Sequence, residues 1–363
     1  MQRNTINDNK IYFMKIAQLV SNLYDVNTFS DRAIYSHVAW LTNGLVDKGN
    51  NVSLFASGKS QTKANLFSVI KKPTSLLKIS EEERKYYIHL LISKCYSLSE
   101  KFDIIHSHFN LLSSFYSNLV KTPTVQSLHS PITNELKQFL LYFKRNRYVS
   151  FSLAQQKTMP ELNWVGNIYH GVDTKIFSFN KNPQDYFLYI GRITEEKGVH
   201  LAIKAARSAG VKLVIAGRSY PKEGYWQKEV EKYIDDKNIK YVGEANFEQK
   251  INLYQNAKAV LFPTQYEEVF GLVMIEAMAC GTPVIGWKKG SVPEIVSHKK
   301  TGFVVDSVSD MVKAIKKINT IKREEVRQRA EIYFSLEKMV SGYLKVYSRI
   351  LEEEKYKNNK KIN

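Results

Sequence analysis

Two glutamates stand eight positions apart around an apolar stretch of the sequence, EEVFGLVMIEAMACGTP, which covers residues 267–283. Glu268 precedes the apolar run and Glu276 lies inside it. A carboxylate in such a run is costly to bury without hydrogen-bond donors. The vicinal hydroxyls of a ribose would supply donors, and so would a lysine or nearby backbone groups of an ordinary protein core. The residues leave both interpretations open.

A second stretch, YIGRITEEKGVHLAIKAA, predicts a short loop between a strand and a helix. Gly191 permits close approach to the backbone, Arg192 offers a planar fork of donors, and Lys197 adds a point charge. Two cations at the start of a helix suit a diphosphate better than a single carboxylate. The alternative is that both cations lie on the surface and pair with Glu195 and Glu196.

The apolar stretch around Glu276 also predicts a helix that begins near Phe270 and Gly271 and stops at Gly281. The first free backbone N–H groups of this helix, around Gly271 and Leu272, would favour an anion. The two stretches therefore complement each other, with cations and a helix N-terminus for phosphates and a carboxylate for a sugar diol.

Short β-rich runs alternate with helical stretches along nearly the whole chain, and this alternation predicts parallel sheets covered by helices on both faces. The strand candidates are residues 14–20, 51–56, 102–108, 123–128, 147–152, 163–170, 186–192, 211–217, 239–243, 259–263, 283–287 and 302–305. We therefore expect an α/β chain of two doubly wound, Rossmann-like domains. Ligands would bind in the cleft between them, beyond the carboxyl ends of the strands.

The most polar join between the two sets of strands is DTKIFSFNKNPQD, residues 173–185, and we place the domain boundary there. We expect five parts along the chain: a disordered N-terminal extension (1–13), a first domain (14–176), a second domain (177–332), a C-terminal helix that packs back toward the first domain (333–352), and a charged, frayed tail (353–363).

The composition limits the classes of partner and compartment. A net charge of +18 and a pI near 9.5 favour polyanionic partners, or else describe a surface rich in lysine. We find no nucleic-acid module and no basic stripe with interleaved aromatic residues, so we expect no nucleic-acid partner. Two cysteines, Cys95 and Cys280, fit a reducing cytoplasm. No apolar run is long enough to span a membrane.

The segment GRITEEKG, followed by EEVFGLVMIEAMACGTPVIGWKKGSVPEIV, closely resembles family 4 of the retaining, nucleotide-sugar-dependent glycosyltransferases. That family has the GT-B fold, with two Rossmann-like domains facing a deep cleft, and a signature of two glutamates separated by seven residues, the spacing found here. The segments WLTNGLVDKGNNVSLFASG, DIIHSH, LHSP, NIYHGVD and TGFVVD follow in the family's usual order. The resemblance covers roughly residues 14–350.

The resemblance implies a donor site in the second domain. Arg192 and Lys197 would hold the donor's diphosphate and stabilise the leaving nucleoside diphosphate. Glu276 would bind the ribose, and Glu268 would contact the transferred hexose. The other donor-binding positions would be Gly191, Gly243 near the base, and Phe270, Gly271 and Leu272, whose backbone would line the phosphate and sugar.

The first domain would hold the acceptor, with His129 facing the reacting sugar. A histidine there would orient the hydroxyl or hydrogen-bond the donor sugar, unless neighbouring backbone satisfies it. His106 and His108 in the HSH tripeptide invite a metal interpretation, but no third ligand stands at a suggestive spacing, and we take the two rings to face opposite sides of a strand. We expect no metal site and regard His108 as a structural residue at the cleft edge.

The implied activity is retaining transfer of a hexose to an acceptor hydroxyl, in the synthesis of a cell-envelope glycan, glycolipid or polysaccharide. UDP-sugars and GDP-mannose are both used across the family, and UDP-glucose is weakly preferred here. The nucleotide sugar is a substrate, so no cofactor is expected. The chain has no Asp-x-Asp motif, so we expect no metal either. The acceptor is not identified.

One segment departs from the family. Many relatives have a glycine-rich loop after the first strand, whereas here SNLYDVNTFSDRAIYSHVAW contains no glycine, and Ser30, Asp31 and Arg32 occupy the corresponding region. This departure keeps open an alternative function, in which a weakly active or inactive GT-B protein binds nucleotide sugar as a sensor or partner.

A last segment, LKQFLLYFKRNR (residues 136–147), combines an apolar stripe with Lys137, Lys144, Arg145 and Arg147. Such a basic amphipathic segment would rest on an anionic bilayer, at the inner face of the membrane. The alternative, which we prefer, is an ordinary core-facing helix with basic ends.

Overall fold

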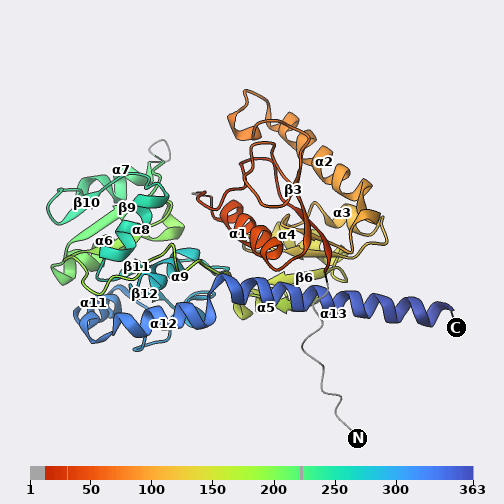
Figure 1. Ribbon diagram of the computed structural model, residues 1–363. Helices are drawn as coiled ribbons and strands as arrows, with labels where there is room; N and C mark the ends of the chain where they lie inside the picture. The colour runs from red at the N-terminus through yellow and green to blue at the C-terminus, as the bar shows by residue number, and fades with distance from the viewer. Residues whose placement is uncertain (1–12, 31, 221–223, 363) are drawn as a thin grey trace, which may run out of the picture.

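The computed structural model describes residues 13–30, 32–220 and 224–362, without the side chains of residues 358, 361 and 362. The predicted N-terminal extension therefore lies outside the described residues, except for Phe13. Figure 1 shows two α/β domains side by side, with a long C-terminal helix running beneath the first.

The first domain has, among the described residues, seven strands in the order β3-β2-β1-β4-β5-β6-β7, all paired in parallel. The strands are β1 (Lys15–Leu19), β2 (Asn51–Phe55), β3 (Asn65–Phe67), β4 (Ile104–Ser107), β5 (Thr124–Ser127), β6 (Arg147–Ser150) and β7 (Trp164–Asn167). The helices are α1 (Ala33–Asp47), α2 (Glu81–Ser97), α3 (Ser114–Ser117), α4 (Asn134–Tyr142) and α5 (Leu153–Thr158).

The second domain has, within the described chain, six parallel strands in the order β10-β9-β8-β11-β12-β13. The strands are β8 (Phe187–Ile190), β9 (Leu213–Ala216), β10 (Ile239–Tyr241), β11 (Val260–Phe262), β12 (Val284–Trp287) and β13 (Gly302–Val305). The helices are α6 (Val199–Ala209), α7 (Tyr225–Glu229), α8 (Phe247–Asn256), α9 (Leu272–Ala279), α10 (Val292–Ile295), α11 (Val308–Lys316) and α12 (Arg323–Tyr333).

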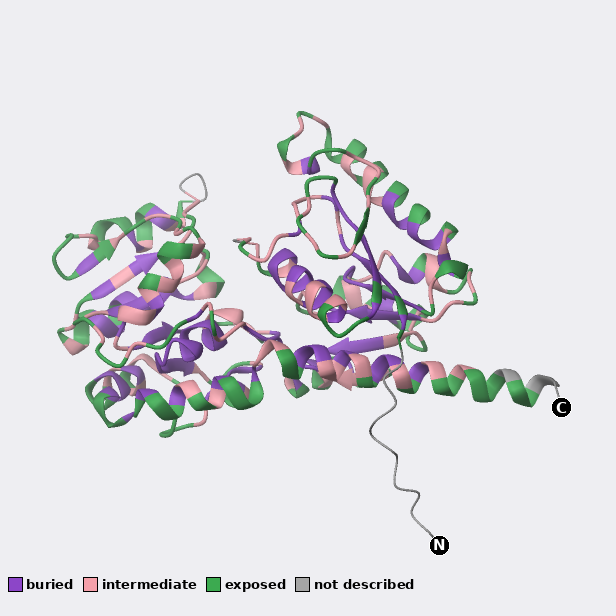
Figure 2. Ribbon diagram, viewed as in Figure 1, coloured by how far each residue is buried: buried purple, intermediate pink, exposed green. Residues whose placement is uncertain are grey.

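The predicted fold class, two doubly wound α/β domains, is confirmed. In both sheets the strand order reverses next to the first strand of the domain, and such a reversal opens a crevice at the carboxyl ends of the strands. Figure 2 shows that the buried residues concentrate in the strands and in the helix faces that cover them. Helix α6 illustrates the pattern, because Val199, Ala202, Ile203 and Ala206 recur at helical spacing and are buried.

Helix α13 (Leu336–Ile362) leaves the second domain and packs on the first (Figure 1). One face of the helix is buried against α1 and the first sheet, through Met339, Val340, Tyr343, Tyr347 and Ile350. The two domains are therefore joined by this helix as well as by the chain between β7 and β8.

The expectation of a frayed tail at residues 353–363 is wrong for residues 353–362, because α13 continues through them. Glu354 on this last part of the helix pairs with Arg147 at the start of β6, and it also lies 3.2 Å from Lys357. Ion pairs one turn apart support a solvated helix. The charged residues that suggested fraying thus stabilise the helix.

Candidate active site between the two domains

A cavity of about 200 Å³ lies between the domains, at the carboxyl ends of the strands of both sheets. Seven of the ten predicted site residues line it: His129, Gly191, Lys197, Glu268, Phe270, Gly271 and Leu272. Arg192, Gly243 and Glu276 do not. The fold thus brings most of the residues of both sequence motifs to one place, opposite a histidine of the first domain.

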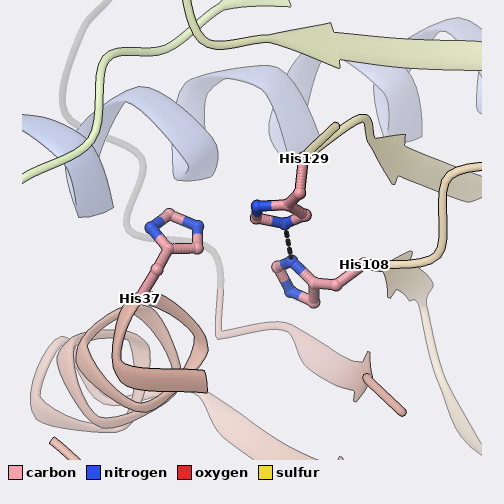
Figure 3. Close-up of side chains that lie close together, drawn as sticks. All are labelled: His37, His108 and His129. Atoms are coloured by element: carbon pink, nitrogen blue, oxygen red, sulfur yellow. Dashed lines mark hydrogen bonds between the residues drawn. The ribbon is translucent and has the colours of Figure 1, made fainter. Parts of the chain in front are cut away.

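The first domain contributes His129 and His170 to the lining of this cavity, and Figure 3 shows His129 with two neighbouring histidines, His37 and His108. His129 follows β5 and lies with its Nε2 3.0 Å from Nδ1 of His108. Burial lowers the pKa of His129 to about 3. The ring is therefore neutral at pH 7 and would meet a substrate as a hydrogen-bond partner rather than as a cation.

The two histidines of the HSH tripeptide lie on the same side of the chain, so the expectation that they face opposite sides is wrong. The ring centroids of His106 and His108 are 4.2 Å apart. Side chains alternate along a strand with period two, so residues i and i+2 point the same way. His106 is held in the core by Ser127 Oγ and Tyr347 OH, 2.7 and 2.6 Å from its two nitrogens.

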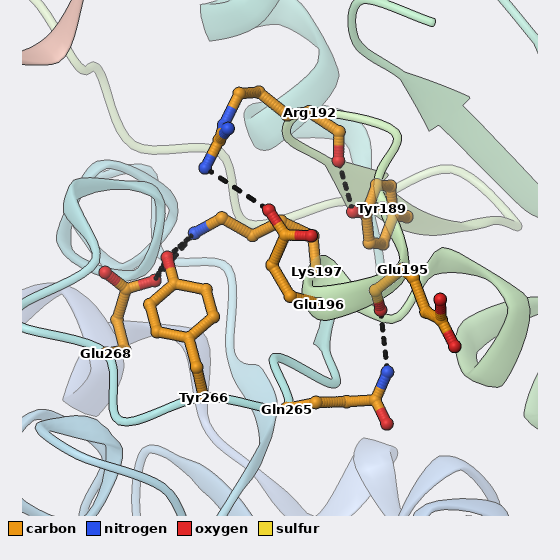
Figure 4. Close-up of polar contacts among 8 residues, drawn as sticks. All are labelled: Tyr189, Arg192, Glu195, Glu196, Lys197, Gln265, Tyr266 and Glu268. Carbon is orange, nitrogen blue, oxygen red and sulfur yellow. Dashed lines mark hydrogen bonds and ion pairs between the residues drawn. The ribbon is translucent and has the colours of Figure 1, made fainter. Parts of the chain in front are cut away.

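On the side of the second domain, Lys197 and Glu268 form an ion pair (Figure 4). Lys197 Nζ lies 2.7 Å from Glu268 Oε2, and the Tyr266 hydroxyl donates to the same oxygen at 2.9 Å. Burial and the adjacent carboxylate raise the pKa of Tyr266 well above its usual value, so it stays a donor. Both charged side chains are mostly buried, at 18% and 11% exposure. The two sequence motifs therefore meet in a single polar cluster.

The loop that carries Lys197 is held by its backbone. A short 3₁₀ turn ends at Gly198, whose φ of +73° is left-handed. A Cβ on Gly198 would lie 2.2 Å from the carbonyl oxygen of Pro263, after β11. Gln265 joins the same two loops, because its backbone N–H donates to Glu196 O at 2.8 Å. Glycine is required here because the loops after β8 and β11 touch.

Arg192 lies at the rim of the cavity rather than inside it. Its side chain is 57% exposed, and its guanidinium is 3.7 Å from Glu196 Oε1. The alternative in which both cations pair with Glu195 and Glu196 at the surface is therefore correct for Arg192. It is not correct for Lys197, which pairs with Glu268. An exposed pair of this kind contributes little to stability.

Helix α9 begins at the cavity, as the sequence predicts. Gly271 precedes it with φ +81°, and a Cβ there would lie 2.8 Å from Met274 Cε. Gly271, Leu272 and Val273 all line the cavity. The N-terminal end of the helix dipole and its first backbone N–H groups are therefore available to an anion there.

Glu276 is 8% exposed, within α9, and finds its donors on α8. Lys250 Nζ lies 2.8 Å from Oε1, and the Tyr254 hydroxyl donates to Oε2 at 2.8 Å. Lys250 therefore satisfies this carboxylate. The sequence left two interpretations open, and this contact is the one expected of a carboxylate in an ordinary protein core. The contact with a ribose stays a prediction.

Gly243 follows β10 with φ +78°, and a Cβ there would meet no other atom within 4 Å. The glycine-free loop of the first domain reaches this region from across the cleft. Phe29 packs edge-on against Phe247, with ring centroids 5.2 Å apart, and Arg32 lies 3.8 Å from Glu244. Asp31, of the same loop, lies outside the described residues.

Comparison with known proteins gives a consistent result. Residues 172–333 match the family model of glycosyl transferases group 1. An uncharacterized glycosyltransferase of Methanocaldococcus jannaschii is 26% identical over 276 residues, 69% of this chain and 77% of that protein. The O-antigen chain mannosyltransferase C of Escherichia coli is 22% identical over 291 residues, 71% of this chain and 78% of the relative. The second domain of this chain therefore matches the group 1 glycosyl transferases, and the chain resembles proteins named glycosyltransferases.

The fold of this glycosyltransferase is GT-B, as predicted. The crystal structure of HepE from Anabaena in complex with UDP-glucose superposes with a TM-score of 0.70 at 18% identity. The match covers 93% of this chain and 100% of that one. The cavity of this chain lies between the two domains, a common position for ligand sites in two-domain proteins.

Sequence reasoning missed three polar residues of this glycosyltransferase's site region: Tyr266, Lys250 and His170. Tyr266 stands two positions before Glu268 in the same loop, so its position offered a signal. Lys250 and His170 offered none, because α8 and the end of β7 approach the site only in the folded chain.

The segment 136–147 is not one amphipathic helix in this glycosyltransferase. Helix α4 ends at Tyr142, a turn follows, and β6 begins at Arg147. Leu140 faces the core, whereas Phe139 and Tyr142 are 49% and 85% exposed. Among the helices of the described residues, none is long and apolar enough to cross a membrane.

Proposed function

We propose that this glycosyltransferase moves a hexose from a nucleotide-diphosphate sugar to an acceptor hydroxyl with retention of the anomeric configuration, as a member of family 4. The observation that carries the proposal is the convergence of the Lys197–Glu268 pair and the first turn of α9 on one cavity. His129 of the other domain lines the same cavity.

The chemical problem in this reaction is the charge that develops on the leaving diphosphate. Lys197 and the N-terminus of α9 meet that charge from positions fixed before reaction, which is the most effective form of electrostatic stabilisation. Arg192 closes on the diphosphate from the rim. In this proposal the diphosphate needs no metal ion, since two cations and a helix N-terminus offset its charge.

We propose reaction on one face of the sugar, with the leaving phosphate helping to deprotonate the acceptor. A double displacement would require a carboxylate free to act as a nucleophile. Glu268 is bonded to Lys197 and Tyr266, and Glu276 to Lys250 and Tyr254. These contacts favour binding roles for both glutamates, with Glu268 on the hexose and Glu276 on the ribose.

UDP-glucose is the first donor to test. HepE, which shares the fold, was crystallised with this donor, while the relative from E. coli is named a mannosyltransferase, so mannose donors belong in the same test. The name of that relative also supports an acceptor in cell-envelope glycan synthesis. We place the reaction in the cytoplasm, at the inner face of the membrane.

The proposed membrane contact is the end of α4 and the turn after it. Phe139 and Tyr142 are exposed there, beside Lys144 and Arg145. An exposed aromatic pair next to basic residues favours an anionic lipid surface. Binding to anionic vesicles is expected to weaken with salt and in Lys144→Glu/Arg145→Glu. Binding indifferent to both changes would remove this contact from the proposal.

The test of the function is a panel of UDP-hexoses and GDP-mannose, measured by thermal shift and by donor hydrolysis. One donor should raise the melting temperature in proportion to occupancy. Lys197→Ala and Glu276→Ala should abolish that shift, and Lys258→Ala, which removes a surface pair with Asp185, should not. A shift without hydrolysis or transfer would instead support the sensor function. No shift with any donor would contradict both the transfer function and the sensor function.

A further inference from the structure

Three histidines of the first domain converge behind the cavity: His37, His108 and His129 (Figure 3). They come from α1, the end of β4 and the loop after β5. Each offers one ring nitrogen, and the three nitrogens lie within 4.8 Å of one another. In the part of the chain that the structure describes, this is the one group of three or more such side chains close enough to hold a metal ion.

One nitrogen of this group has no partner. His37 Nδ1 lies 2.7 Å from Nδ1 of His170, so those two nitrogens share a proton. His37 Nε2 is buried and has no hydrogen-bond partner among the described residues. Figure 3 shows a nitrogen of the His37 ring directed toward His129 and His108. An unpaired nitrogen in a buried site requires an explanation, and a ligand is one.

The second histidine is already oriented for coordination. His108 Nε2 lies 2.8 Å from Oε1 of Gln18, an acceptor, so Nε2 carries the proton. The lone pair of His108 is therefore on Nδ1, which faces His129 Nε2 at 3.0 Å. A ligating histidine almost always donates its other N–H to a neighbouring group, and Gln18 accepts that bond here.

The surroundings keep the three rings neutral. Burial and the neighbouring histidines lower the pKa of His37 and His108 well below the usual range. Phe151 packs against His37 and His129, at centroid distances of 5.6 and 4.7 Å. Neutral imidazoles in an apolar surround are ligands for zinc and similar transition ions, not for magnesium or calcium.

We propose that His37 Nε2, His108 Nδ1 and His129 Nε2 bind one zinc ion in the wall of the first domain. Tetrahedral zinc with bonds of about 2.0–2.1 Å holds its nitrogens about 3.3 Å apart. Side-chain rotation must therefore close the widest spacing, which is within 4.8 Å, and open the His108–His129 spacing of 3.0 Å slightly. The proton between His108 and His129 moves to Nδ1 of His129 when the metal binds. A water completes the coordination, and the cavity that His129 lines is the entry path.

This site lies apart from the residues assigned to the donor's diphosphate, and it does not depend on the proposed transfer reaction. Zinc would fix the ring of His129, the residue that lines the sugar cavity from the first domain. The expectation of a metal-free chain rested on the spacing of His106 and His108 and on the absence of an Asp-x-Asp motif. Neither criterion detects ligands that lie on three separate elements.

The experiment is a titration of chelator-stripped, untagged protein with Zn²⁺ and with Co²⁺. We expect one equivalent to bind, with visible Co²⁺ bands typical of a four-coordinate nitrogen site. His37→Asn and His108→Asn should weaken binding by more than about 100-fold, and Gln18→Ala by about 10–100-fold. His89→Asn, on the outer helix α2, is the matched control and should bind as the wild type does.

A second measurement needs no variant. X-ray absorption at the zinc edge of the loaded wild type should show three imidazole ligands, and zinc should raise its melting temperature. Circular dichroism and urea unfolding report whether each variant folds. Binding of less than one equivalent, a spectrum with fewer than three imidazoles, or equal affinity in folded His37→Asn and wild type would each overturn the proposal.

Discussion

Lys197 and Glu268 are separated by 71 positions in the chain and by 2.7 Å between Nζ and Oε2. Each follows a neighbouring strand of the second sheet, β8 or β11, and the crossing loops bring them together at the cavity. In the proposed function, the pair fixes the ammonium group beside the donor's diphosphate. It also prevents Glu268 from being a free carboxylate.

Replacing Lys197 by methionine should affect stability and donor binding together. The Glu268 carboxylate, 11% exposed, would keep only the Tyr266 hydroxyl, and the free energy of unfolding should fall by about 1–3 kcal/mol. The donor-induced thermal shift should disappear. Lys258→Met, which removes a surface pair with Asp185, should cost about 0–1 kcal/mol in urea unfolding and leave donor binding intact. Equal effects of the two substitutions would contradict this prediction.

Replacing Glu276 by glutamine separates a structural role from a ribose-binding one. Lys250 would lose its ionic partner, and unfolding stability should fall by about 1–3 kcal/mol. If Glu276 also binds the ribose, donor affinity measured by calorimetry should fall at least tenfold. Tyr254→Phe is the matched control, because it removes a donor to the same carboxylate but leaves the charge. A Glu276→Gln protein that binds donor as tightly as Tyr254→Phe would limit Glu276 to packing.

Tyr254 should make the protein sensitive to alkali. Burial beside Glu276 raises the pKa of its hydroxyl well above 10 in the folded state. Above pH 10 the tyrosine of the unfolded chain loses its proton while the folded one keeps it, so its contribution is full below pH 10 and is lost as the pH rises. Between pH 9 and 11, urea unfolding of the wild type should lose about 1.4 kcal/mol more than that of Tyr254→Phe. If the unfolding stability of the two proteins changes with pH in the same way, the raised pKa of Tyr254 is refuted.

Replacing Gly271 by alanine should damage the start of α9. The residue has φ +81°, and a Cβ there would lie 3.2 Å from Phe262 Cζ and 3.3 Å from Glu268 Cγ, while Met274 Cε, at 2.8 Å, can move aside. Gly210→Ala is the control, with φ +67° and nothing within 4 Å of the new Cβ, and should cost only the left-handed penalty of about 1–2 kcal/mol. Gly271→Ala should cost more in thermal unfolding and should weaken donor binding, whereas Gly210→Ala should leave the donor affinity unchanged.

The sequence predicted the strands of both sheets except β3, since β-rich runs bounded by polar segments have a local signature. It missed β3 (Asn65–Phe67), a three-residue edge strand, and α2 (Glu81–Ser97). Both have weak patterns, because an edge strand and an outer helix bury few side chains.

The sequence also predicted where α9 begins and which loops form the cavity. Gly271 and Gly281 limit the helix through backbone conformation, and the motif around Lys197 follows a strand, so local chemistry and the rule for parallel sheets were sufficient. These rules account for Gly191, Lys197, Gly271 and Leu272 in the lining of the cavity, whereas the family resemblance supplied His129 and Glu268.

Only the tertiary structure decided which side chains satisfy the buried charges and rings. Lys250 and Tyr254 reach Glu276 from α8, and His37 reaches His108 and His129 from α1. The physical reason is that hydrogen bonds and metal ligands depend on distances of a few ångströms, and folding sets those distances between residues that no sequence period connects.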